Sequence, residues 1–233
     1  MKKPPVVLAI IPARGGSKGI PRKNVRLVAG RPLIVHTIAQ ALAANTVTRV
    51  VVSTDDDEIA GISAAAGAEV IRRPDEISGD TASSESALSH ALAHLWSSEG
   101  YRPDLVVFLQ CTSMLRRVHD IDRAVEVLRE QDADSLLSVS PSHRFLWAEV
   151  DGVMTSLNYD YSRRPRRQDM RRQYVENGSI YVFKPGVLEQ TGNRLGGKIA
   201  VHVMDEESAL DIDSLLDMKM AEQILLQREE FGK

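Results

Sequence analysis

Short apolar runs alternate with amphipathic stretches along most of this chain. The apolar runs predict buried strands over residues 6–11, 49–53, 69–71, 105–109, 135–139, 179–183 and 199–204. Between them, apolar residues recur every three or four positions, which predicts helices over 32–44, 55–67, 84–99 and 118–130, and a closing helix around 216–225. Strands that alternate with helices are typical of βαβ units. We therefore predict an α/β fold with a mostly parallel sheet that carries helices on both faces.

This regular pattern breaks between residues 142 and 176. The stretch contains several aromatic residues and a dense run of arginines, but its apolar positions show little periodicity. The strand pattern returns at Ser179. We interpret residues 142–176 as a small protruding subdomain, and residues 1–141 together with 177–233 as the core from which it projects.

The segment after the first predicted strand combines glycine with positive charge. It runs from Ala13 to Asn24 and contains three glycines and four cations, which are Arg14, Lys18, Arg22 and Lys23. Glycine lets backbone N–H groups approach an anion, and Lys and Arg pair well with phosphate. Open α/β sheets bind ligands at the carboxyl ends of their strands, where this loop begins. We predict a phosphate-binding loop, with a solvated glycine turn as the alternative, because its spacing matches neither the P-loop nor the dinucleotide fingerprint.

Composition narrows the class of protein. The 233 residues are 43% hydrophobic and suit one α/β domain with a small subdomain. A net charge of −3 argues against a general binder of nucleic acid or of membrane surfaces, and no apolar run reaches transmembrane length. The basic residues at the N-terminus are not followed by a signal-peptide cleavage site. The single cysteine, Cys111, cannot form an internal disulfide. We therefore expect a protein of the reducing cytoplasm.

The glycine loop resembles a known signature. A-R-G-G-S-K-G-I-P-x-K-N, at residues 13–24, is similar to the first motif of the acylneuraminate cytidylyltransferases, the family that makes CMP-sialic acid and CMP-Kdn from CTP. Four more segments resemble the family's motifs in the same order: R-P-x-E-x3-D-T-A-S-S at 73–84, L-Q-C-T-S-M-L-R at 109–116, R-P-R-R-Q-D…Y-V-E-N-G-S-I-Y at 164–181, and D-I-D at 211–213. Met114 replaces the family's usual proline, and the arginine-rich segment looks closer to the animal-type members.

The resemblance implies a Rossmann-like nucleotidyltransferase fold, a dimerisation role for the subdomain, and a homodimer or a dimer of dimers. It assigns nucleotide binding to Ala13, Arg14, Gly15, Ser17, Lys18, Lys23, Asn24, Arg73, Ser84 and Gln110. It assigns sugar-acid binding to Gln110, Arg167, Gln168 and Tyr181. An arginine suits a carboxylate substrate because it binds the group through two parallel hydrogen bonds. For the arginine run alone, an RNA-binding stripe and a solvated face are the alternatives.

Asp211 and Asp213 are the candidate metal ligands. Alternate residues of an extended segment point the same way, so both carboxylates can face one site. Mg²⁺ prefers a few carboxylates together with substrate phosphates. The alternative is a helix cap, because Asp213 precedes the closing helix. The family's D-I-D motif assigns its metal to this pair.

These motifs together predict an enzyme. We expect it to transfer CMP from CTP to the anomeric hydroxyl of a sialic-acid-like nonulosonic acid, with Mg²⁺ as cofactor and with Lys18, Lys23 and Asp211 as catalytic residues. The expected partners are CTP and the sugar acid, with neither nucleic acid nor a membrane. The alternatives are a cytidylyltransferase for a legionaminic-type acid or for 3-deoxy-octulosonate, and a non-catalytic nucleotide-binding regulator.

Overall fold

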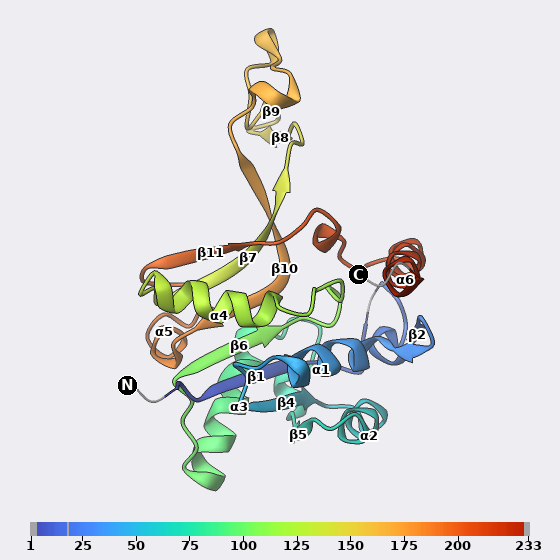
Figure 1. Ribbon diagram of the computed structural model, residues 1–233, viewed down its shortest axis with the longest axis vertical. Helices are drawn as coiled ribbons and strands as arrows, with labels where there is room; N and C mark the ends of the chain where they lie inside the picture. The colour runs from blue at the N-terminus through green and yellow to red at the C-terminus, as the bar shows by residue number, and fades with distance from the viewer. Residues whose placement is uncertain (1–3, 18, 231–233) are drawn as a thin grey trace.

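The computed structural model describes residues 4–17 and 19–230. Its centre is a seven-stranded sheet with the strand order β11-β7-β10-β6-β1-β4-β5 (Figure 1). These strands are β1 (Val7–Pro12), β4 (Arg49–Thr54), β5 (Glu69–Arg72), β6 (Leu105–Leu109), β7 (Ser135–Ser142), β10 (Gln173–Phe183) and β11 (Ile199–Val203). Neighbouring strands are parallel except that β10 is antiparallel to both β6 and β7. The predicted α/β fold with a mostly parallel sheet is confirmed.

Helices cover both faces of the sheet. One face packs against α1 (Leu33–Ala43), α2 (Asp57–Ala65), α4 (Asp120–Glu130) and α6 (Leu215–Glu230). The other face packs against α3 (Ser84–Glu99) and α5 (Pro185–Thr191). In β1, Val7 and Ala9 belong to the first hydrophobic cluster, whereas Leu8 and Ile10 belong to the second. A central strand that is buried on both faces explains why its sequence is apolar at almost every position.

The largest differences from the expected strand boundaries lie in β7 and β10. The ladder between these strands continues outward and pairs Gln173 with Ser142 and Glu176 with Val139, before the register shifts between Glu176 and Tyr181. Tyr174 and Val175 are exposed in this outer part. The sequence therefore lacks the buried apolar pattern there, although the backbone is extended.

Residues 143–172, which we call the arm, project from the end of this ladder (Figure 1). The arm contains the hairpin of β8 (Trp147–Val150) and β9 (Val153–Ser156) and two short 3₁₀ turns. Its aromatic side chains pack on one another, with ring centroids 4.4 Å apart for Phe145 and Tyr159. Among the described residues, none of the helices combines the length and the apolar character that crossing a membrane requires.

Candidate functional site

A pocket of about 300 Å³ lies where β1 and β6 end and α3 begins. Six residues that were predicted to bind the nucleotide line this pocket: Arg14, Ser17, Lys23, Asn24, Ser84 and Gln110. Pro12, Gly16, Phe108, Cys111 and Thr112 complete its wall. Its position at the carboxyl ends of parallel strands is the usual ligand position of an open α/β sheet. Lys18, which was also predicted to bind here, lies outside the described residues.

The glycine loop is held by an internal hydrogen bond and by hydrogen bonds to two other segments, around Gly79 and at residues 53–55. The side-chain amide of Asn24 donates to the carbonyl of Arg14 at 3.1 Å, and Arg14 donates to the carbonyl of Gly79 at 2.9 Å. The N–H of Gly15 donates to the carboxylate of Asp55 at 3.0 Å, and the N–H of buried Ala13 donates to the carbonyl of Ser53 at 2.9 Å. The backbone N–H groups of Ala13 and Gly15 are therefore engaged within the protein, whereas Arg14 lines the pocket.

Lys23 connects the glycine loop to the D-I-D segment. Its ammonium group donates to the carbonyl of Ile212 at 2.6 Å and to the carboxylate of Asp213 at 3.3 Å, and its side chain is only 12% exposed. A Cβ atom on Gly19 would lie 2.7 Å from the carbonyl oxygen of Asp213, so the two backbones are in close contact. The structure thus brings two motifs that lie almost 190 residues apart in sequence to one place.

The D-I-D segment exposes two carboxylates, which are the candidate metal ligands. Ile212 is buried, whereas Asp211 and Asp213 on either side of it are exposed. The hydroxyl of Ser113 donates to Asp211 at 3.5 Å. The part of the chain that the structure describes holds no group of three or more His, Cys, Asp or Glu side chains able to bind a metal ion. Two carboxylates fit Mg²⁺, because this ion commonly takes one or two protein carboxylates and completes its shell with water and phosphate oxygens.

Gln110 is positioned by a buried arginine that the sequence analysis did not single out. Arg116 is 4% exposed and donates to the carbonyls of Gln110 and Ser179, each at 2.7 Å. It also donates to the side chains of Thr37 and Gln40. Burial lowers the pKa of Arg116 to about 10. The signal available in the sequence was a charged residue shortly after a buried strand. Apart from Gln110, its partners come from distant segments.

Gly178 lies against the side chain of Gln110. Its φ is +65°, in the left-handed region that favours glycine, and a Cβ atom there would lie 2.7 Å from the Gln110 Oε1 atom. The neighbouring Asn177 is buried, and its carbonyl accepts a hydrogen bond from Ser113. The irregular part of β10, at Asn177 and Gly178, therefore packs against Gln110 and Ser113 at this side of the pocket.

Arg73 is buried next to the site without lining the pocket. Its guanidinium donates to the carbonyl of Ser53 at 2.6 Å and to the Ser53 hydroxyl at 3.2 Å. Burial lowers the pKa of Arg73, and the nearby Asp55 partly offsets this effect. Because the Ser53 carbonyl also accepts the N–H of Ala13, Arg73 supports the start of the glycine loop in this structure.

The predicted sugar-acid residues do not lie together in one chain. Arg167 and Gln168 line a second pocket of about 440 Å³ at the base of the arm, where Arg167 donates to Glu206 at 3.1 Å. Tyr181 is 2% exposed and stacks on Phe108 with ring centroids 5.3 Å apart, and its hydroxyl donates to Glu176. Burial and this hydrogen bond raise the pKa of Tyr181 to about 12. Only Gln110 of the four lines the first pocket.

Comparison with known proteins places the chain in a family. The family model for cytidylyltransferases matches residues 8–228. The chain is 39% identical over 231 residues to N-acylneuraminate cytidylyltransferase A of Danio rerio, covering 97% of this chain and 52% of that protein. It is 34% identical over 230 residues to post-translational flagellin modification protein B of Campylobacter coli, covering 95% and 96% of the two chains.

Solved structures share its fold. A CMP:2-keto-3-deoxy-manno-octonic acid synthetase in complex with CTP superimposes with a TM-score of 0.73 at 18% identity, covering 96% of this chain and 99% of the other. The chain spans about half the length of the fish relative and almost the whole length of the Campylobacter relative. The match over nearly all residues shows that the chain belongs to the cytidylyltransferase family.

Proposed function

We propose that the protein transfers CMP from CTP to the anomeric hydroxyl of a sialic-acid-like nonulosonic acid and releases pyrophosphate. The observation that carries this proposal is the pocket at the carboxyl ends of β1 and β6, where residues from three of the five motifs meet. The 39% identity to a fish N-acylneuraminate cytidylyltransferase supports the same substrate class. We place the enzyme in the cytoplasm, where its single free cysteine stays reduced.

In the proposed reaction, the anomeric oxygen attacks the α-phosphorus of CTP and pyrophosphate leaves. Arg14, Ser17, Lys18 and Lys23 hold the phosphates, and Asn24 and Gln110 orient the nucleotide and the attacking group. Transfer of this kind depends mainly on alignment and on neutralisation of charge, because the phosphates carry most of the charge in the transition state. Arg14 and Lys23, the two cations of the glycine loop that line the pocket, would supply that neutralisation.

We propose Asp211 and Asp213 as the ligands of Mg²⁺. When bound, the ion would supply positive charge to the phosphate oxygens. Lys23 lines the pocket and contacts Asp213, so the D-I-D segment lies beside the pocket, although neither Asp211 nor Asp213 is among the lining residues. Asp217 stays outside this pair, since its carboxylate accepts hydrogen bonds from the Ser214 hydroxyl and from the N–H groups of Ser214 and Asp213, which keep its pKa low.

The contact between Gly19 and Asp213 gives a first prediction. We expect Gly19→Ala to lower kcat/KM about tenfold or more, because a Cβ atom 2.7 Å from a carbonyl oxygen forces the two segments apart. Gly61→Ala in α2 is the matched control, since its Cβ would meet no atom within 4 Å. Pyrophosphate release at several CTP concentrations measures both variants. Equal activity of the two would show that the contact has no role in the reaction.

We propose a homodimer, or a dimer of dimers, in which the arm contacts the partner subunit. The arm exposes large apolar side chains: Leu146, Trp147, Val150, Val153, Met154, Leu157 and Tyr161. Exposed apolar side chains concentrated in one short segment are typical of an interface. Such a contact would also place the second pocket, with Arg167 and Gln168, between two subunits, which agrees with its separation from Gln110 within one chain.

A single charge on the arm tests this arrangement. We expect Met154→Asp to weaken dimerisation about 30-fold or more, because an unpaired carboxylate would be buried against an apolar partner surface. The control is Val118→Asp, at an apolar residue outside the arm that is 72% exposed. Sedimentation velocity over a range of protein concentrations measures the change. If both variants associate like the unmodified protein, the arm is not the interface.

The proposed activity is tested with a panel of acceptors. Pyrophosphate release from CTP and Mg²⁺ is measured with N-acetylneuraminic acid, its deaminated form, a legionaminic-type acid and 3-deoxy-octulosonate. We expect the highest kcat/KM with one of the first two acids. A higher kcat/KM with the legionaminic-type acid or with 3-deoxy-octulosonate would identify that acid as the substrate instead. Nucleotide binding without pyrophosphate release from any acid would identify a regulator and contradict the proposed enzyme.

A further inference from the structure

Three carboxylates at the start of α2 lie against the glycine loop. Asp55 accepts the N–H of Gly15, and a Cβ atom on Gly15 would lie 2.7 Å from a carboxylate oxygen of Asp56. Glu58 follows in the first turn of the helix. Carboxylates repel phosphates, so three of them beside a phosphate-binding loop would weaken the binding of a triphosphate unless their charge is compensated.

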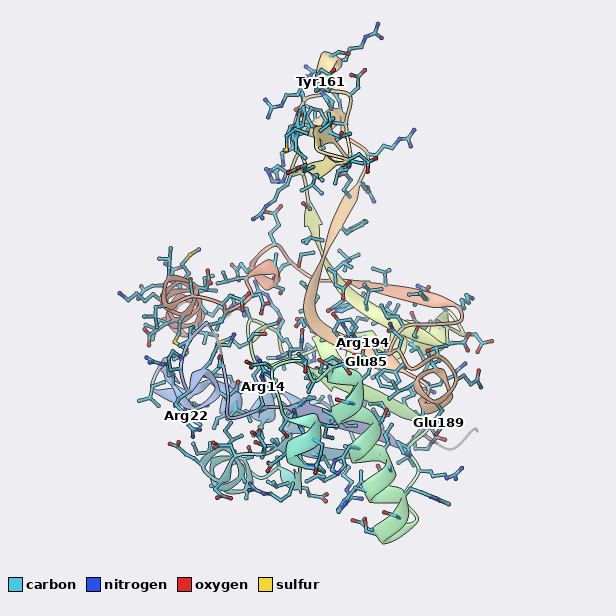
Figure 2. The ribbon with its side chains drawn as sticks, turned by 180° about the vertical axis from the view of Figure 1, so that it is seen from behind. Arg14, Arg22, Glu85, Tyr161, Glu189 and Arg194 are labelled. Carbon is cyan, nitrogen blue, oxygen red and sulfur yellow. The ribbon has the colours of Figure 1, made fainter. Side chains whose placement is uncertain are left out.

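Arg22 pairs with two of these carboxylates and offsets part of their charge. Its guanidinium donates to both carboxylate oxygens of Asp56, with one N···O distance of 3.0 Å, and it also donates to Glu58. This pairing lowers the pKa of Asp56 to about 2, so the carboxylate stays charged throughout the neutral range. Arg22 is not among the residues that line the pocket, although it belongs to the same basic loop as Arg14. The two arginines lie apart, and Arg22 lies on the side of α2 (Figure 2).

The same contacts determine where the next turn begins. Arg22 is the N-terminal flanking residue of a short 3₁₀ turn, η1 (Lys23–Val25), and it has a φ of +59°. This left-handed conformation is unfavourable for a residue with a Cβ atom, so contacts elsewhere must hold it. Lys23 follows directly and extends to the carbonyl of Ile212. The contacts of Arg22 with Asp56 and Glu58 therefore hold the residue that directly precedes Lys23, and Lys23 lines the pocket.

We propose that Arg22 shields the triphosphate from the charges of Asp56 and Glu58 without contacting the nucleotide. This inference rests on the proposed function, because it needs a triphosphate in the pocket. An ion pair with a purely structural role would contribute little to stability, since the Arg22 side chain is 42% exposed, and its loss would not affect KM for one substrate more than for the other.

The test is the salt dependence of CTP use by Arg22→Met. At about 50 mM salt we expect KM for CTP to rise about tenfold, with KM for the sugar acid unchanged within about twofold. At about 500 mM salt the increase should shrink to about threefold, because salt screens the uncovered carboxylates. Adding Asp56→Asn and Glu58→Gln to Arg22→Met should recover most of the loss at low salt. Asparagine is a suitable replacement for Asp56 because it caps a helix as well as aspartate does.

Arg31→Met is the matched control, because it removes the same charge from an exposed arginine outside the loop, in β3 (Arg31–Pro32). We expect its KM for CTP to stay within about twofold of the unmodified protein. If Arg22→Met does not fold, Asp56→Asn with Glu58→Gln in the otherwise unmodified chain replaces it. That variant leaves Arg22 uncompensated and should lower KM for CTP about threefold at low salt.

Three results would overturn the inference: an unchanged KM for CTP in Arg22→Met, an increase that is the same at both salt concentrations, or an unchanged KM in the Asp56→Asn and Glu58→Gln variant. Each presupposes that the unmodified protein uses CTP. If the unmodified protein does not release pyrophosphate from CTP with any acid, the proposed function fails instead. The two failures are therefore distinguishable.

Discussion

Asp211→Asn should lower the rate of CMP-sugar formation by about 1,000-fold or more, while the protein stays folded. Asparagine keeps the size of the side chain and can still accept the hydrogen bond from Ser113, but it removes the negative charge that Mg²⁺ requires. Asp211 is exposed, so the fold does not depend on its charge. Pyrophosphate release at saturating CTP and sugar acid measures the loss.

The control is Asp57→Asn, which changes the same group at a side chain that is 97% exposed in the first turn of α2. We expect it to retain activity within about twofold. Thermal unfolding of both variants should match that of the unmodified protein within a few degrees. Near-normal turnover in Asp211→Asn would remove this residue from the metal site and leave the D-I-D segment with a structural role.

The second large effect is expected for Lys23→Met, with kcat/KM for CTP lowered about 100-fold or more. The ammonium group lines the pocket and also connects the glycine loop to the carbonyl of Ile212 at 2.6 Å. Methionine keeps an unbranched side chain of similar length but removes both the positive charge in the pocket and this hydrogen bond. Steady-state kinetics with CTP as the varied substrate measures the change.

Lys219→Met, at an exposed position of α6, is the matched control for the lost charge and should leave kcat/KM unchanged within about twofold. Lys23→Arg should recover part of the activity, because a guanidinium also pairs with phosphate but has a different shape. A Lys23→Met variant that is less stable yet has normal kcat/KM for CTP would show that the lysine only joins two segments.

Sequence periodicity predicted the core elements because their environment repeats along the chain. β6 is buried at all five positions, and α4 buries one side of the helix, so both patterns are unambiguous. The direction of β10 was not predictable, since a buried apolar run looks the same in a parallel and an antiparallel strand. Its outer part was missed because Tyr174 and Val175 are exposed and give no pattern of burial.

The part of the candidate site whose motifs come directly after a strand was predictable from the sequence. Residues after β1 and β6 meet at one pocket because adjacent parallel strands end at the same edge of a sheet. The supports of the site were not predictable in this way. Arg116 binds the carbonyl of Ser179, which lies 63 positions away, and Arg22 has its partners at the start of a helix more than 30 positions away. Such pairs depend on the packing of whole elements, which local sequence does not specify.

The position of CTP tests the central claim most directly. A crystal structure of the protein soaked with CTP and Mg²⁺ should show the triphosphate against Arg14, Ser17 and Lys23, with the metal between the phosphates and the pair Asp211 and Asp213. Nucleotide bound at a different surface, with this pocket empty at saturating CTP, would contradict the assignment of the pocket and every role derived from it.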